Sequence, residues 1–180
     1  MKNLRFSILV GVSALVYLSA CDRSSTSEPQ IAGSERFSNQ VHLAIVLLRT
    51  RDPKAYSIIT NYIGRIQEGN HSGMSAYNTP PTYEMADVTA FYSLTWCAAT
   101  IAHDSFHSKL YLDYQKLHEG SVPDEVWTGT AAEQKCMKHQ LEVMKQIGAT
   151  PWEINYAKTQ ADGHYVKDHE TLEDYNKRDW

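Results

Sequence analysis

Helix-start signals recur along this chain and constrain its fold more than any other feature. Asp52-Pro53 and Thr150-Pro151 each place an N-capping side chain directly before proline, which fits the first turn of a helix. Thr130-Ala131-Ala132-Glu133 has the pattern of a capping box, and Gly148 is a typical helix end. We therefore expect a mainly α-helical domain with little or no β-structure, an α+β fold being the alternative.

Apolar periodicity predicts the remaining elements. The run Val41–Leu48 favours a buried helix. The helix opened by Asp52-Pro53 is expected to carry Ile59 and Ile66 on one face and to stop near residue 69, and a long helix is expected from Val88 to about Leu117. The proline-containing segment 71–84 between them is expected to be a loop, with at most a short extended piece at residues 74–77.

The first twenty residues have the features of a secretory leader. Lys2 and Arg5 precede the uncharged stretch Phe6–Ala20, which is short for a membrane span because a spanning helix needs about 20 apolar residues. Leu18-Ser19-Ala20-Cys21 resembles the lipobox of bacterial lipoproteins. This resemblance implies cleavage before Cys21, acylation of its thiol and anchoring in the envelope membrane. The alternative is an ordinary signal peptide followed by a chance cysteine.

The residues after Cys21 suggest a membrane location and a flexible tether. Asp22 resembles the inner-membrane retention signal of enteric bacteria, which implies the periplasmic face of the inner membrane in a Gram-negative cell. Residues 21–36 are rich in Ser, Thr, Pro and Gly and are expected to form a flexible tether, which leaves 37–180 as a single domain. The formal net charge of −4 argues against a nucleic-acid partner.

Two histidines in the long helix carry the strongest chemical signal. His103 and His107 are four residues apart, so they stand on one face of the helix, and imidazoles at this spacing can bind one metal ion. Asp104 occupies the position that the HExxH zinc motif gives to its proton-accepting glutamate. The alternative is a pair of structural histidines in the core.

Glu133 begins the next strong helix, and the four residues together resemble the gluzincin-type metallopeptidases. The resemblance covers roughly Trp96–Gly148. It implies zinc held by His103, His107 and Glu133, with Asp104 as the general base, acting on peptides or peptidoglycan-like amides of the envelope. It also implies an edge strand beside the zinc helix, for which residues 73–77 are the one candidate. The alternative role for Glu133 is that of a capping-box residue.

The motif departs from that family at Asp104. Aspartate is one methylene shorter than glutamate, which withdraws the carboxylate by about 1.5 Å. A catalytic group misplaced by about 1 Å can cost around 10²-fold in rate. The sequence therefore leaves open a site that binds metal and turns over slowly.

The two remaining cysteines, Cys97 and Cys136, lie on the helices that carry the proposed ligands. In an extracytoplasmic compartment, and with antiparallel helices, a Cys97–Cys136 disulfide would clamp the ligand helices together. The alternative is two buried free thiols.

Two other functions remain open at this point. Adjacent His103-Asp104 also resembles the central dyad of HD-type metal phosphohydrolases, which need an upstream histidine and a downstream aspartate; His71 and either Asp113 or Asp124 are the candidates. The third alternative is an envelope lipoprotein that is non-catalytic or binds metal without turnover.

Overall fold

The computed structural model describes residues 27–164 of the chain. The predicted signal peptide (residues 1–20), the predicted lipidation site Cys21 and the residues after His164 lie outside this part. Within it, the elements are, in order, β1 (Gln30–Ala32), α1 (Glu35–Arg51), α2 (Pro53–Tyr62), β2 (Arg65–Gly69), β3 (Gly73–Ser75), β4 (Thr82–Ala86), α3 (Asp87–Ala90), α4 (Leu94–Leu117), α5 (Asp124–Trp127), α6 (Thr130–Ile147) and α7 (Pro151–His164). The fold is thus mainly α-helical with a small sheet, an α+β arrangement.

The sheet is larger than the sequence indicates. Its strand order is β1-β2-β4-β3, with β1, β2 and β4 parallel and β3 antiparallel at one edge. One row of register partners is apolar and turns toward the core: Ile31, Ile66, Tyr83 and Met74. The neighbouring row is polar, with Gln30, Arg65, Thr82 and Ser75. This two-sided pattern is what a sheet with one covered face requires.

The predicted helix over residues 53–69 is wrong in its second half. Helix α2 ends at Tyr62, and Ile66 lies in β2 instead. Gly64 marks the change, because its amide donates to the carbonyl of Pro81 at 2.9 Å. A β-carbon at Gly64 would lie 2.3 Å from Cβ of Pro80, so this close approach of two segments requires glycine.

The tether prediction also needs correction in its second half. Gln30–Ala32 form β1, which pairs with β2, and Ser34 caps α1 by accepting from the amide of Phe37. Glu28 accepts hydrogen bonds from Arg49 at 3.1 Å and Tyr56 at 2.7 Å. The folded part of the chain therefore begins before residue 37, because three residues suffice to add an edge strand to an existing sheet.

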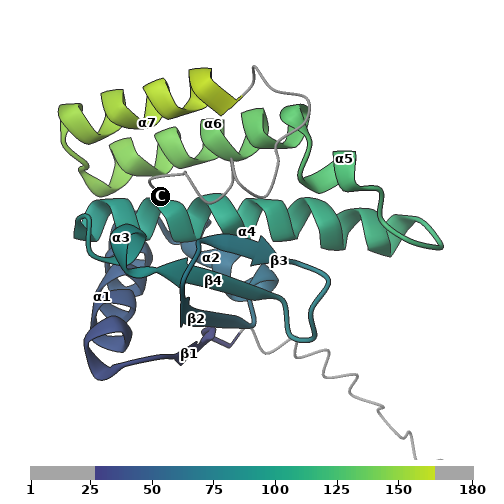
Figure 1. The fold of residues 1–180 in the computed structure, drawn as a ribbon, viewed down its shortest axis with the longest axis horizontal. Coiled ribbons are helices and arrows are strands. Elements are labelled where there is room, and N and C mark those ends of the chain that lie inside the picture. Colours follow the sequence, from purple (N-terminus) through teal and green to yellow (C-terminus); the bar gives the residue numbers. More distant parts are fainter. Residues whose placement is uncertain (1–26, 165–180) are drawn as a thin grey trace, which may run out of the picture.

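Helices α1, α2 and α4 bury the apolar face of the sheet, and α6 and α7 form a further layer on α4 (Figure 1). The expected long helix is interrupted: α3 ends at Ala90, and Ser93 caps α4 by accepting from the amide of Trp96. The start of α4 packs against the end of α6 through Trp96, Ala99 and Met144, so the two helices are antiparallel. Across the described residues, no helix has the length and apolarity needed to cross a bilayer.

Candidate metal centre

Helices α4 and α6 bring the three predicted ligands together. Nε2 of His103 lies 3.0 Å from Nε2 of His107. Oε2 of Glu133 lies 3.4 Å from Nε2 of His103 and 3.5 Å from Nε2 of His107. In the described part of the chain, this is the one group of three or more potential ligands whose donor atoms all lie within 4.8 Å of one another.

These separations fit a bound zinc ion. Tetrahedral ligands about 2.1 Å from a common ion are about 3.4 Å from one another. The Glu133 separations of 3.4 and 3.5 Å match that value, and the His103–His107 separation of 3.0 Å is slightly shorter. The side chains of His103, His107 and Glu133 are 13%, 7% and 21% exposed, so the group is mostly buried but still in contact with solvent.

The start of α6 explains why Glu133 is available. The N-cap of this helix is Gly129, and no side chain forms a capping hydrogen bond there. The predicted capping box between Thr130 and Glu133 is therefore wrong, although the helix does begin at Thr130. Because Glu133 does not cap its own helix, its carboxylate is directed to the histidines.

The loop before α6 orients one histidine. Nδ1 of His107 donates to the carbonyl oxygen of Trp127 at 2.5 Å. This bond leaves the lone pair of Nε2 directed at the cluster, as a metal-binding imidazole requires. Nδ1 of His103 is buried and has no hydrogen-bond partner among residues 27–164. Sequence reasoning missed Trp127, because a backbone carbonyl carries no sequence signal.

Charge interactions hold the cluster together. Burial alone would raise the pKa of the Glu133 carboxyl, but hydrogen bonds and charge from His103 and His107 outweigh burial and hold this pKa well below its usual range. Burial alone would lower the pKa of His107, but contacts with Cys136 and Glu133 raise it well above its usual value. The close approach of Glu133 to the two imidazoles therefore favours the charged form of its carboxylate.

Asp104 lies beside the ligands on α4 and interacts with a residue of the sheet. Burial raises the pKa of its carboxyl, and the charges of His103 and His107 act in the opposite direction. Tyr83, on β4, lies close enough to Asp104 to lower the pKa of its carboxyl slightly. Tyr83 is fully buried and is a second residue that the sequence did not reveal as part of the site.

Comparisons with protein-family models, curated proteins and solved structures find no match to this chain. The assignment of the site rests on its own geometry.

The predicted disulfide is not present. Cys97 and Cys136 are both free and buried. Cys97 lies six residues before His103, which turns it about 120° around the helix from that histidine. Its sulfur accordingly lies 3.9 Å from Sδ of Met85 in the core beneath α4, whereas Cys136 contacts His107.

Alkylation of the unreduced, denatured protein is expected to label both Cys97 and Cys136 completely. The reason is that the Cys97 thiol faces the core beneath α4, whereas the Cys136 thiol, on α6, faces His107. Peptide mass spectrometry measures the labelling, with a reduced sample as the control. A cross-linked peptide containing both cysteines would contradict the structure.

The residues nominated for a phosphohydrolase do not join the cluster. Asp113 instead accepts from Tyr62 at 2.7 Å, from Lys109 at 2.5 Å and from Lys116 at 3.1 Å. His71 and Asp124 are likewise absent from the group of converging ligands. The structure therefore supplies His103-Asp104 with neither of the further ligands that the dyad needs.

Asp113 is expected to stabilise the fold in a pH-dependent way. Burial raises its pKa, but the contacts with Lys109, Tyr62 and Lys116 lower it overall, from 3.8 to about 2. A lowered folded-state pKa means that the stabilisation is present above about pH 4 and is lost as the pH falls toward 2. Because the side chain is 34% exposed, we expect Asp113→Asn to cost at most about 1 kcal/mol at pH 6. Urea unfolding measures this cost, and an equal cost at pH 2 would contradict the assignment.

Proposed function

We propose that the chain is a zinc-dependent hydrolase of the metallopeptidase type, acting in the bacterial cell envelope. The observation that carries the proposal is the convergence of His103, His107 and Glu133, with the separations that zinc ligands need. Two imidazoles and one carboxylate form a donor set of catalytic zinc sites, which keep a further coordination position open.

The residues around the cluster have definable roles in this proposal. His103, His107 and Glu133 would hold the ion, and a zinc ion supplies Lewis-acid activation of water and of a carbonyl group. Asp104 would accept a proton at its carboxylate during attack on the substrate, with Tyr83 of β4 beside it. The carbonyl of Trp127 keeps the His107 ring oriented.

The sheet supports a peptide-like substrate. The gluzincin resemblance implies an edge strand before the zinc helix that lines the substrate cleft. β3 (Gly73–Ser75) is such an edge strand, because it pairs with β4 alone and contacts α4. An edge strand offers backbone donors and acceptors to an extended chain, which would align a peptide or the peptide stem of a cell-wall polymer.

The proposed lipid anchor would keep this site close to the membrane. Glu28, whose side chain contacts Arg49 and Tyr56 in the fold, lies seven positions after Cys21. Seven residues span at most about 25 Å. An acylated Cys21 would therefore hold Glu28, at the start of the folded part, within that distance of the periplasmic face of the inner membrane.

The proposal is tested by hydrolysis of amide substrates. The zinc-loaded protein is expected to cleave fluorogenic peptides or cell-wall stem peptides, and 1,10-phenanthroline is expected to abolish the cleavage. Restoration by added zinc excludes an effect of the chelator on the substrate. A protein that binds zinc but cleaves neither substrate class would favour the non-catalytic alternative.

A further inference from the structure

A cluster of aromatic side chains lies where the start of α4 meets the start of α7. Tyr92 precedes α4, Trp96 lies in its first turn, and Trp152 and Tyr156 lie on α7. Trp152 is 63% exposed and Tyr92 is 38% exposed, whereas Trp96 is only 1% exposed beneath them. Tyr92, Trp152 and Tyr156 form what we call the aromatic platform.

The rings of the platform are nearly parallel. The interplanar angles are 13° for Tyr92–Trp152, 12° for Tyr92–Tyr156 and 11° for Trp152–Tyr156, with centroids 6.0, 5.9 and 5.5 Å apart. Trp96 supports them from below, with centroids 5.0 Å from Tyr92 and 5.4 Å from Tyr156. Rings this close leave no room for a cation among them, which excludes an aromatic cage of the kind that binds quaternary ammonium groups.

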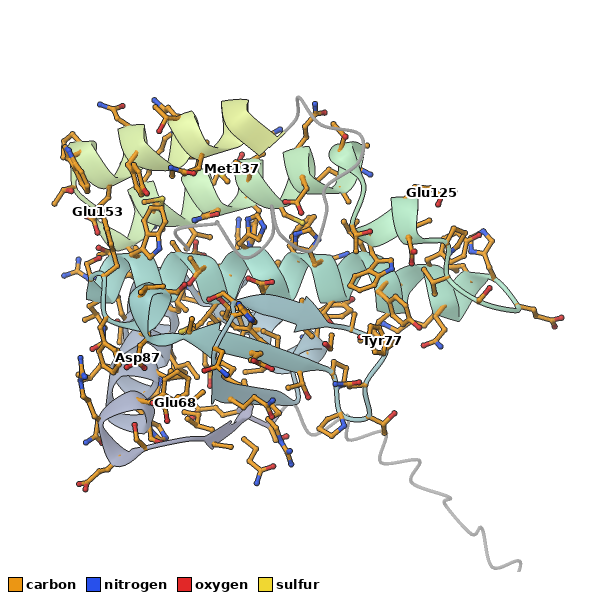
Figure 2. All side chains as sticks on the ribbon, viewed as in Figure 1. Glu68, Tyr77, Asp87, Glu125, Met137 and Glu153 are labelled. Carbon is orange, nitrogen blue, oxygen red and sulfur yellow. The ribbon has the colours of Figure 1, made fainter. Side chains whose placement is uncertain are left out.

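Hydrogen bonds beneath the platform fix its position. The carboxylate of Glu153, which is 5% exposed, accepts from the hydroxyls of Ser93 at 2.5 Å and Thr95 at 2.6 Å. Its other oxygen accepts from the amide and hydroxyl of Thr150 at 2.7 and 2.8 Å. Figure 2 places Glu153 at the end of the molecule opposite Tyr77 and Glu125. The two helix starts that carry the rings are thereby joined through one buried carboxylate.

The exposed side chains of α7 near the platform are polar, and Lys158 is one of them. Glu153 is buried and its oxygens already accept four hydrogen bonds, so it presents no charge to a ligand. Asn155 and Thr159 are exposed on α7, on either side of Tyr156 in the sequence. Stacked, partly exposed aromatic rings with amide and hydroxyl groups on the same helix suit a ligand that can stack on a ring and is rich in hydroxyl or amide groups.

We propose that the aromatic platform is a binding site for neutral sugar rings of a glycan. The C–H groups on one face of a pyranose are weakly positive and stack on the negative face of an aromatic ring. The hydroxyl and acetamido groups at the edge of the sugar would bond to side chains such as Asn155. Because the rings are held before the ligand arrives, little ordering cost is added on binding.

The platform does not depend on the metal centre, although the two are near each other. Trp96 and His103 are seven residues apart on α4, a rise of about 10 Å. Tyr92 precedes Trp96 along the chain, so a glycan held on the platform would lie at least about this far along α4 from the proposed hydrolytic site. A polymer with sugar and peptide parts could contact both.

Calorimetric titration of the full-length protein with a soluble β-1,4-linked N-acetylglucosamine oligomer tests the proposal. We expect saturable binding, and we expect Trp152→Ala to weaken it about tenfold, by loss of one stacking surface. Leu43→Ala is the matched control, since Leu43 is also exposed (56%) but lies on α1. It is expected to leave binding unchanged.

Three results would overturn the proposal. The first is no binding of the oligomer by the native protein. The second is equal binding by the native protein and Trp152→Ala. The third is loss of binding to anionic phospholipid vesicles in Trp152→Ala without any sugar binding, which would make the platform a membrane-contact surface. Circular dichroism of Trp152→Ala verifies that the exposed substitution leaves the fold intact.

Discussion

Zinc added to the metal-free protein is expected to raise its unfolding temperature by about 5–10 °C, and His107→Ala is expected to abolish the rise. A ligand at 100 times its dissociation constant stabilises the native state by about 2.7 kcal/mol. For a domain of this size, each kcal/mol shifts the unfolding temperature by roughly 2–4 °C. Removal of His107 leaves two donors of the three. Differential scanning fluorimetry with and without zinc measures the effect.

The control for this experiment is His42→Ala. His42 is an exposed histidine on α1, where it bonds the carbonyl of Ser38. The His42→Ala substitution removes an imidazole that lies outside the cluster, so this variant is expected to keep the full zinc response. An equal zinc response in His107→Ala and the native protein would place the metal elsewhere.

Asp104→Asn is expected to lower the rate of hydrolysis by about 10²–10⁴-fold, the usual contribution of a general base. The amide is nearly the same size as the carboxylate, but it cannot take up a proton. Zinc stabilisation is expected to persist in this variant. The rate is measured with the fluorogenic peptide, and the zinc response by scanning fluorimetry.

Asp113→Asn is the matched control for Asp104→Asn, since it neutralises another aspartate on α4 that pairs with Lys109 and Lys116. It is expected to leave the rate unchanged. Loss of the zinc response in Asp104→Asn would make that aspartate a ligand, as in the phosphohydrolase dyad. An unchanged rate in Asp104→Asn would exclude its role as the base.

The helix starts were predictable because they depend on local signals. α2 begins at Pro53, α6 at Thr130 and α7 at Pro151, each at a residue that the sequence identifies. The position of His103 and His107 on one face of α4 was predictable for the same reason, because helical spacing alone determines it. Their approach to Glu133 required only that α4 and α6 be antiparallel neighbours.

The sheet was not predictable from local pattern. β2 contains a single strongly apolar residue, Ile66, and its strand conformation comes from pairing with β1 and β4 on either side. Tertiary pairing here overrides the helical pattern that continues from α2. The contact of Tyr83 with Asp104 was hidden likewise, because it depends on how β4 packs beneath α4.

The cysteines show the limit of reasoning from spacing along the chain. Cys97 and Cys136 do lie on neighbouring antiparallel helices, as expected. Spacing along a helix does not by itself place two side chains face to face, because rotation about the helix axis also counts. Cys97 is rotated toward the core and Met85, away from the helix that carries Cys136.

X-ray absorption spectroscopy of the zinc-loaded protein tests the central claim most directly. We predict one zinc per chain with nitrogen and oxygen ligands at about 2.0–2.2 Å and the outer-shell scattering of two imidazoles. In Glu133→Ala, a carboxylate oxygen should be replaced or the ion lost. A first shell without imidazole scattering, or one containing sulfur at about 2.3 Å, would contradict the assigned ligand set.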